Sequence, residues 1–128
     1  MKNIFAIVFI AAASVAVAQK QVVSAYNANK SGDYEAAAGY IEEAITIEKA
    51  ALKDKTWRYR GEIYLNIAND SALVVEFPNA LWVAKESYTK AKELDTKGNY
   101  EREIITGLSL VQTTAGNQGI TDYTTENY

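Results

Sequence analysis

The residues that could carry chemistry in this sequence are carboxylates, and the residue types that usually act with them are missing. The chain of 128 residues contains no cysteine and no histidine. This excludes the usual zinc sites and the Ser-His and Cys-His arrangements of nucleophilic catalysis. Glu42 with Glu43, and Glu101 with Glu103, could suggest a glycosidase, but residues so close along a helix do not face one another. The sequence therefore indicates a protein that is not an enzyme and that uses no cofactor or metal.

An apolar N-terminal segment predicts export. Lys2 precedes an unbroken apolar run from Ile4 to Ala13, and Ala16-Val17-Ala18 forms an A-x-A cleavage site before Gln19. We interpret residues 1–18 as a cleaved secretory signal peptide. The run is shorter than the roughly 20 residues of a membrane-spanning helix, so no membrane insertion is expected after cleavage. The form of the signal suits a bacterial signal peptidase, which favours the periplasm, with secretion as the alternative.

Charge narrows the range of partners. Removing residues 1–18 takes away Lys2 and changes the formal net charge from −3 to −4. A mildly acidic chain does not suit nucleic acid or an anionic membrane, both of which call for clustered lysine and arginine. Without cysteine there is no disulfide, so stability must come from helix packing alone.

Two stretches must position any functional residue, namely Lys55–Tyr64 and Ala84–Asp95. The first places a ring, a gap and a second ring on one helical face, at Trp57, Gly61 and Tyr64. The second repeats at the same spacing and contains small alanines that let a neighbouring backbone come close. The pattern W-x3-G-x2-Y followed by A-x3-Y-x2-A resembles the tetratricopeptide repeat, a helix-turn-helix unit of about 34 residues.

The resemblance implies an all-α fold of antiparallel helical hairpins stacked as a short solenoid. The first repeat would span residues 19–53, with one helix over Gln21–Lys30 and a second over Tyr34–Ala50, capped by Asp33. The second repeat would span residues 54–97, with an inserted loop at about residues 69–78. Trp57 and Tyr64 are expected in the core, nested against the alanine ridge at Ala84 and Ala91.

Residues 98–128 predict one long helix, from Tyr100 to about Tyr123, and an incomplete third repeat. Asn127-Tyr128 align with Asp33-Tyr34, so the chain would stop where a second helix should start. A missing helix would leave an exposed apolar stripe. Either the sequence is part of a longer repeat protein, or another molecule covers the stripe, including a second copy bound through this C-terminal face.

The resemblance also implies a binding surface. Proteins similar to this one hold peptides on a concave side lined by the first helix of each repeat. The candidate contact residues, which would point outward from those helices, are Tyr26, Asn29, Arg58, Tyr59, Glu62 and Asn66. Aromatic, amide and guanidinium groups of this kind anchor interfaces, although each could also belong to an ordinary solvated helix face.

Arg60 and the inserted loop offer further candidates. Arg60 replaces an apolar residue of the family and is expected to pair with Glu42, Glu43 or Glu62, with anion binding as the alternative. The loop contains an apolar run, Leu73–Phe77, which would pack as a flap on the rim of the first hairpin or form a lid over a groove. Ser71, in Asp70-Ser71-Ala72, is a possible O-glycosylation site.

These observations favour a non-catalytic interaction or scaffolding module of the bacterial cell envelope, whose partner is a protein or peptide segment. Two alternatives stay open. One is a glycan- or cell-wall-binding module in which exposed aromatic residues stack on sugars, namely Tyr26, Tyr59, Trp82 and Tyr100. The other is a self-associating structural subunit.

Overall fold

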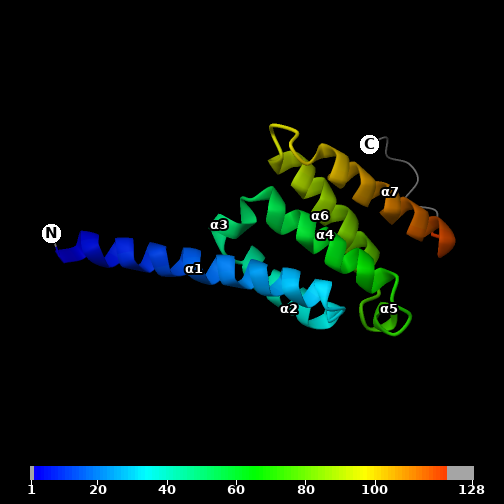
Figure 1. Cartoon of the computed structure of the whole chain (residues 1–128), viewed down its shortest axis with the longest axis horizontal. Coiled ribbons are helices and arrows are strands. Elements are labelled where there is room, and N and C mark those ends of the chain that lie inside the picture. The colour runs from blue at the N-terminus through cyan, green and yellow to red at the C-terminus, as the bar shows by residue number, and fades with distance from the viewer. Residues whose placement is uncertain (1, 121–128) are drawn as a thin grey trace.

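The computed structural model describes residues 2–120 of the chain, with side chains described from residue 13 onward. Every regular element in this part is a helix, as the sequence predicts (Figure 1). The helices are α1 (Lys2–Lys30), α2 (Tyr34–Ile45), α3 (Glu48–Ala51), α4 (Asp54–Ala68), α5 (Leu73–Glu76), α6 (Ala80–Leu94) and α7 (Glu101–Asn117).

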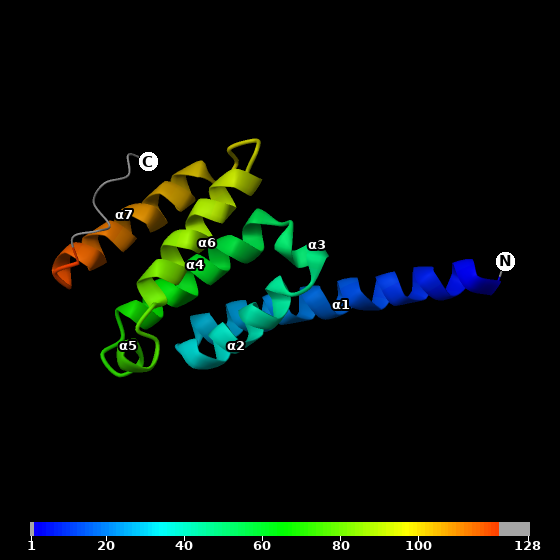
Figure 2. The ribbon, with the colours of Figure 1, turned by 180° about the vertical axis from the view of Figure 1, so that it is seen from behind.

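The long helices follow one another across the molecule as neighbouring pairs. α1 packs against α2, and α4 packs against α6 in the most extensive helix–helix contact of the described chain. α2 joins the two pairs by packing on α4, and α7 covers α6 and part of α4. Figures 1 and 2 show the resulting order, with α1 and α2 on one side of the α4–α6 pair and α7 on the other.

α1 is one continuous helix of 29 residues, whereas the sequence predicted a helix beginning at Gln21. Its N-terminal half extends beyond the rest of the bundle (Figures 1 and 2). No break marks the predicted boundary after Ala18, which is buried. Neither glycine nor proline occurs before Gly32, so nothing in this segment interrupts a helix. Within residues 2–120, no helix is both long and apolar enough to cross a membrane.

The second helix of the first hairpin is shorter than predicted. Asp33 caps α2 as expected, because its carboxylate accepts a hydrogen bond from the backbone N–H of Ala36 at 3.2 Å. The helix ends at Ile45 instead of continuing to Ala50, and α3 follows as a separate turn. The β-branched run from Ile45 to Ile47 disfavours helix, and the Thr46 hydroxyl donates to the carbonyl of Glu43.

The centre of the core is the ring of Tyr88, held between two glycines. A Cβ atom at Gly61 would lie 2.8 Å from this ring, and a Cβ atom at Gly107 would lie 2.3 Å from it. The gap predicted at Gly61 is therefore filled by Tyr88 of α6. Tyr64 is buried as predicted, whereas Trp57 is only half-buried and donates its indole N–H to the carbonyl of Ala51 at 2.8 Å.

The inserted loop contains the short helix α5. The Asp70 carboxylate accepts hydrogen bonds from the backbone N–H groups of Ala72 and Leu73 at 2.9 and 3.0 Å, which starts this turn. The Phe77 ring lies edge-on to Tyr64, with 6.4 Å between the ring centroids. α5 packs mainly on α4, so the prediction that this segment covers the first hairpin is wrong. Leu73 is partly buried against the core, whereas Val75 is 78% exposed.

α7 ends earlier than predicted. It runs to Asn117, and Gly119 then adopts a φ of +72°, a conformation that suits glycine and turns the chain. The proposed match of Asn127-Tyr128 to the first repeat lies outside the described residues. The exposed positions of α7 are mostly polar, and its two large exposed apolar residues, Ile105 and Leu110, are too far apart in helical phase to share a face. The apolar stripe of α7 is therefore buried in the core, and no continuous apolar stripe is exposed on the described part of this helix.

Candidate binding surface

The six predicted contact residues lie on α1 and α4, and the structure brings them together in adjacent pairs. The ring centroids of Tyr26 and Tyr59 are 5.1 Å apart, with the ring planes inclined by 38°. Tyr26 is exposed and Tyr59 is half-buried. Such a tilted aromatic pair stabilises the contact between the two helices and still presents ring surface to solvent.

Lysines stand beside both rings of this pair. The ammonium group of Lys30 lies 5.4 Å from the centroid of the Tyr26 ring, and that of Lys55 lies 5.6 Å from the centroid of the Tyr59 ring. Both distances are within the range of a cation–π interaction. We call the four residues Tyr26, Tyr59, Lys30 and Lys55 the tyrosine–lysine patch. It offers apolar ring surface next to positive charge, which suits a partner carrying aromatic and acidic groups.

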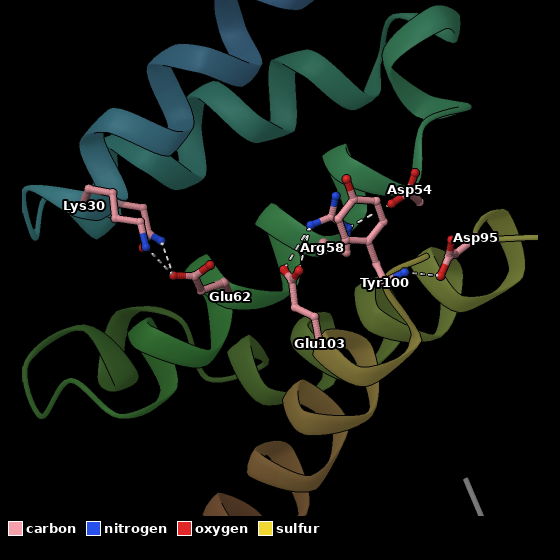
Figure 3. Close-up of polar contacts among 8 residues, drawn as sticks. Lys30, Asp54, Arg58, Glu62, Asp95, Tyr100 and Glu103 are labelled. Atoms are coloured by element: carbon pink, nitrogen blue, oxygen red, sulfur yellow. Dashed lines mark hydrogen bonds and ion pairs between the residues drawn. The ribbon is translucent and has the colours of Figure 1, made fainter. Parts of the chain in front are cut away.

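Next to the patch, an amide and carboxylate network joins α1 to α4. The Asn29 amide donates to Glu62 at 3.2 Å and accepts from the Asn66 amide at 2.9 Å. Lys30 approaches the same Glu62 oxygen at 3.4 Å (Figure 3). The negative charge of Glu62 raises the pKa of Lys30 above its ordinary value. Asn29 is buried, so the prediction that it points outward is wrong. Its amide forms hydrogen bonds to α4 and does not face solvent.

Arg58 is the second predicted contact residue that turns inward. Only 6% of it is exposed, and its Nε donates to Asp54 at 2.9 Å. Its Nη1 donates to both oxygens of Glu103 on α7, at 3.0 and 3.1 Å (Figure 3). Burial lowers the pKa of Arg58, but the hydrogen bonds to Asp54 and Glu103 outweigh it, so the pKa lies above its ordinary value. Arg58 therefore joins α4 to α7 and is not free to hold a partner.

The turn between α6 and α7 supplies the last part of this arrangement. The Asp95 carboxylate accepts hydrogen bonds from the backbone N–H groups of Asn99 and Tyr100, at 3.0 and 2.9 Å. This places the Tyr100 ring over the Arg58 guanidinium, whose carbon is 3.7 Å from the ring centroid (Figure 3). Sequence reasoning missed the roles of Tyr100 and Glu103.

Arg60 forms a separate cluster that links α4 to α2 and α6. Its Nε donates to Glu42, one of the three acids that the sequence offered, at 2.8 Å, and its Nη1 donates to the Ser87 hydroxyl at 3.0 Å. The Tyr64 hydroxyl donates to the same Glu42 oxygen at 2.9 Å. Burial, together with this bond to Glu42, raises the pKa of Tyr64. The guanidinium is thus satisfied internally, which leaves the anion-binding alternative without support.

A groove lies on another part of the surface, on the outer side of α6. It has a volume of about 520 Å³ and is lined by both tryptophans of the chain, Trp57 and Trp82. Lys85, Glu86, Lys90 and Glu93 line it as well, and the Lys90 ammonium lies 3.5 Å from the Glu93 carboxylate. Of the aromatic platforms expected for sugar stacking, Tyr100 is occupied by Arg58, whereas Trp82 is 49% exposed.

The acidic residues show no arrangement typical of catalysis. Within residues 2–120, no group of three acidic residues is placed to hold a metal ion. Glu103 pairs with Arg58, Glu42 pairs with Arg60, and Glu43 accepts a hydrogen bond from Gln21. The carboxylates singled out in the sequence are therefore mostly engaged in contacts that join helices.

The possible glycosylation site is accessible. Ser71 is exposed in the loop before α5, next to the Asp70 carboxylate that starts the helix. Its modification stays a prediction.

Comparisons with protein-family models, curated proteins and solved structures returned no match to this chain.

Proposed function

We propose that this chain is a non-catalytic, tetratricopeptide-type binding module of the bacterial cell envelope that holds a protein segment against the tyrosine–lysine patch. The assignment to this class rests on the pairing of α1 with α2 and of α4 with α6, in the order that the repeat pattern implies. The predicted signal peptide supports export to the periplasm, with secretion as the alternative.

The observation that carries the proposal is the pair of exposed Tyr26 and half-buried Tyr59, with Lys30 and Lys55 beside their rings. Aromatic rings give large, rigid contact area, and they are enriched where binding energy concentrates. The neighbouring polar groups are engaged in contacts between helices. Asn29 joins α1 to α4, and Arg58 joins α4 to α7. A fixed surface binds without the entropic cost of ordering its own side chains.

The charges of the patch define the partner further. Lys30 and Lys55 lie beside the rings; Glu62 lies 3.4 Å from Lys30, and no ion pair joins Lys55 to a described residue, so Lys55 carries most of the available positive charge. An extended segment with an aromatic residue next to aspartate or glutamate would stack on the rings and pair with the lysines. Such rim charges steer association, and their effect falls as salt is added.

The proposal is tested by selecting binders from a peptide library and measuring their affinity for the unaltered chain and for two variants, Tyr59→Ala and Tyr40→Ala. Tyr59→Ala removes half of the aromatic pair and should weaken binding about tenfold or more, as loss of an interface anchor does. Tyr40→Ala is the matched control, because Tyr40 is an exposed tyrosine on α2, outside the patch. If both substitutions leave the affinity unchanged, the patch is not the binding surface.

A second candidate function rests on the groove at Trp57 and Trp82. Two indole rings lining one open groove suit the flat apolar face of a sugar, and the paired charges beside them favour a neutral ligand. Quenching of tryptophan fluorescence by soluble glycans, lost in Trp82→Ala, would support this function. Fluorescence that stays unchanged at millimolar glycan would exclude it.

The third possibility, self-association through the C-terminal face, has less support. The exposed face of α7 is mostly polar, with Ile105 and Leu110 on different sides of the helix. Light scattering that shows a defined dimer would overturn this ranking.

A further inference from the structure

A cluster of lysines lies beside α1 where this helix leaves the bundle. Lys49 of α3, Lys53 of the following turn and Lys55 of α4 line one small cavity of about 160 Å³. Its other walls come from α1 and include Val15 and Val22. The chain as a whole is acidic, with a net charge of −3, so positive charge is concentrated at this end.

Two of these lysines have no internal partner. Lys49 and Lys53 form no ion pair with any described residue, and Lys55 lies over the Tyr59 ring. The two acids nearest in sequence do not neutralise the cluster. Asp54 is engaged by Arg58 at 2.9 Å, and the exposed Glu48 does not line the cavity that the three lysines share. The cluster is thus a surface of unpaired positive charge.

The lysine cluster adjoins the helix that projects from the bundle. Residues 15–19 of α1 contribute to the same cavity, and the helix continues from there away from the other helices (Figures 1 and 2). The sequence of this projecting part is apolar from Ile4 to Ala13, and Val17 is 50% exposed at its base. The projecting, apolar part of α1 therefore has the three lysines beside its base.

We propose that, in the chain that retains residues 1–18, this end of the molecule docks on an anionic lipid bilayer. The apolar half of α1 enters the acyl region, and Lys49, Lys53 and Lys55 contact the lipid phosphates. Basic residues strengthen a short apolar anchor in this way, since neither signal alone gives stable binding. Lipid fits better than nucleic acid or an acidic protein, because only a bilayer offers a hydrocarbon layer beneath a layer of negative charge.

This inference does not depend on the tyrosine–lysine patch. Peptide binding at the patch could fail while membrane docking holds, and the reverse is also possible. Lys55 belongs to both surfaces, so it is left unchanged in the test.

The test is co-sedimentation of the full 128-residue chain with vesicles of phosphatidylglycerol and phosphatidylcholine, compared with phosphatidylcholine alone. Each lysine near an anionic surface strengthens partitioning about fivefold at low salt. Lys49→Gln with Lys53→Gln should therefore weaken binding to the anionic vesicles about 25-fold. The matched control is Lys92→Gln with Lys97→Gln, which removes two exposed lysines near the turn between α6 and α7, across the bundle from α1 (Figure 1). It should change binding less than twofold.

Three results would overturn the proposal. The first is equal binding to neutral and anionic vesicles, which would mean that the apolar segment acts alone. The second is unchanged binding of the Lys49→Gln, Lys53→Gln chain. The third is binding to soluble polyglutamate as tight as to the anionic vesicles, which would make the cluster a site for acidic segments instead.

Discussion

Replacing Gly107 by alanine should destabilise the protein, although the same change normally stabilises a helix. In a helix interior alanine is favoured over glycine by about 1 kcal/mol. At Gly107, however, the new Cβ would lie 2.3 Å from the Tyr88 ring, and the ring has little room to move because it also packs closely against Gly61. Overpacking a filled core costs about 1–3 kcal/mol, occasionally more. At this separation the cost is at the upper end, so we expect a net loss of about 2 kcal/mol.

The assay is urea unfolding followed by far-UV circular dichroism, with Gly39→Ala as the matched control. Gly39 lies inside α2 with no atom within 4 Å of its would-be Cβ, so alanine there should raise the free energy of unfolding by about 0.5–1 kcal/mol. Replacing the Tyr88 ring by a smaller side chain, in Tyr88→Leu, should turn Gly107→Ala from destabilising to neutral or stabilising. If Gly107→Ala stabilises the unaltered chain as much as Gly39→Ala does, the close packing around Tyr88 is wrong.

Three other predictions concern the polar contacts and pH. Glu42→Gln should lower the free energy of unfolding by about 1–2 kcal/mol, because it removes the negative charge that pairs with buried Arg60; the loss stays in this range because the Glu42 carboxylate is itself partly exposed to solvent. An unchanged urea midpoint would contradict the Arg60 cluster. Glu103→Gln should cost less, about 1 kcal/mol, since Asp54 still accepts from Arg58, and a loss as large as that of Glu42→Gln would be unexpected. Burial raises the pKa of Tyr88 above its ordinary value of 10.0, so the folded state keeps a proton that the unfolded state loses. This stability is fully present below pH 10 and is lost as the pH rises toward the folded pKa. Above pH 10, Tyr88 should make the free energy of unfolding fall by about 1.4 kcal/mol per pH unit. Unfolding measurements from pH 9 to 12 test this, because the fall should be smaller in Tyr88→Phe.

The sequence predicts the helices more reliably than it predicts their ends. Helical spacing and cap chemistry are local, so α4, α6 and the Asp33 cap could be predicted. The end of α2 at Ile45 depends on a balance between a β-branched run and strong helix formers on either side. The continuity of α1 is a related case, because the segment before Gly32 contains no glycine or proline that would stop a helix.

The partners of long side chains were harder to predict. For Arg60 the sequence offers Glu42, Glu43 or Glu62, and the structure selects Glu42, at 2.8 Å. The helical register of α4 predicts an outward Arg58. Its contact with Glu103 could not be foreseen, because Glu103 lies 45 residues later, on α7. Tyr88 was predicted on a helical face, but its position between two glycines depends on how three helices converge. Contacts of this kind are set by tertiary packing, which spacing within one helix does not describe.

The central claim is that the tyrosine–lysine patch on α1 and α4 binds a protein segment, and chemical-shift mapping tests it most directly. The measurement is a titration of the isotope-labelled chain with a library-selected peptide. We predict the largest shift changes at Tyr26 and Tyr59 and at their neighbours on α1 and α4, with little change at Tyr40 or Trp82. Changes centred on the Trp57–Trp82 groove or on the outer face of α7 would contradict the claim.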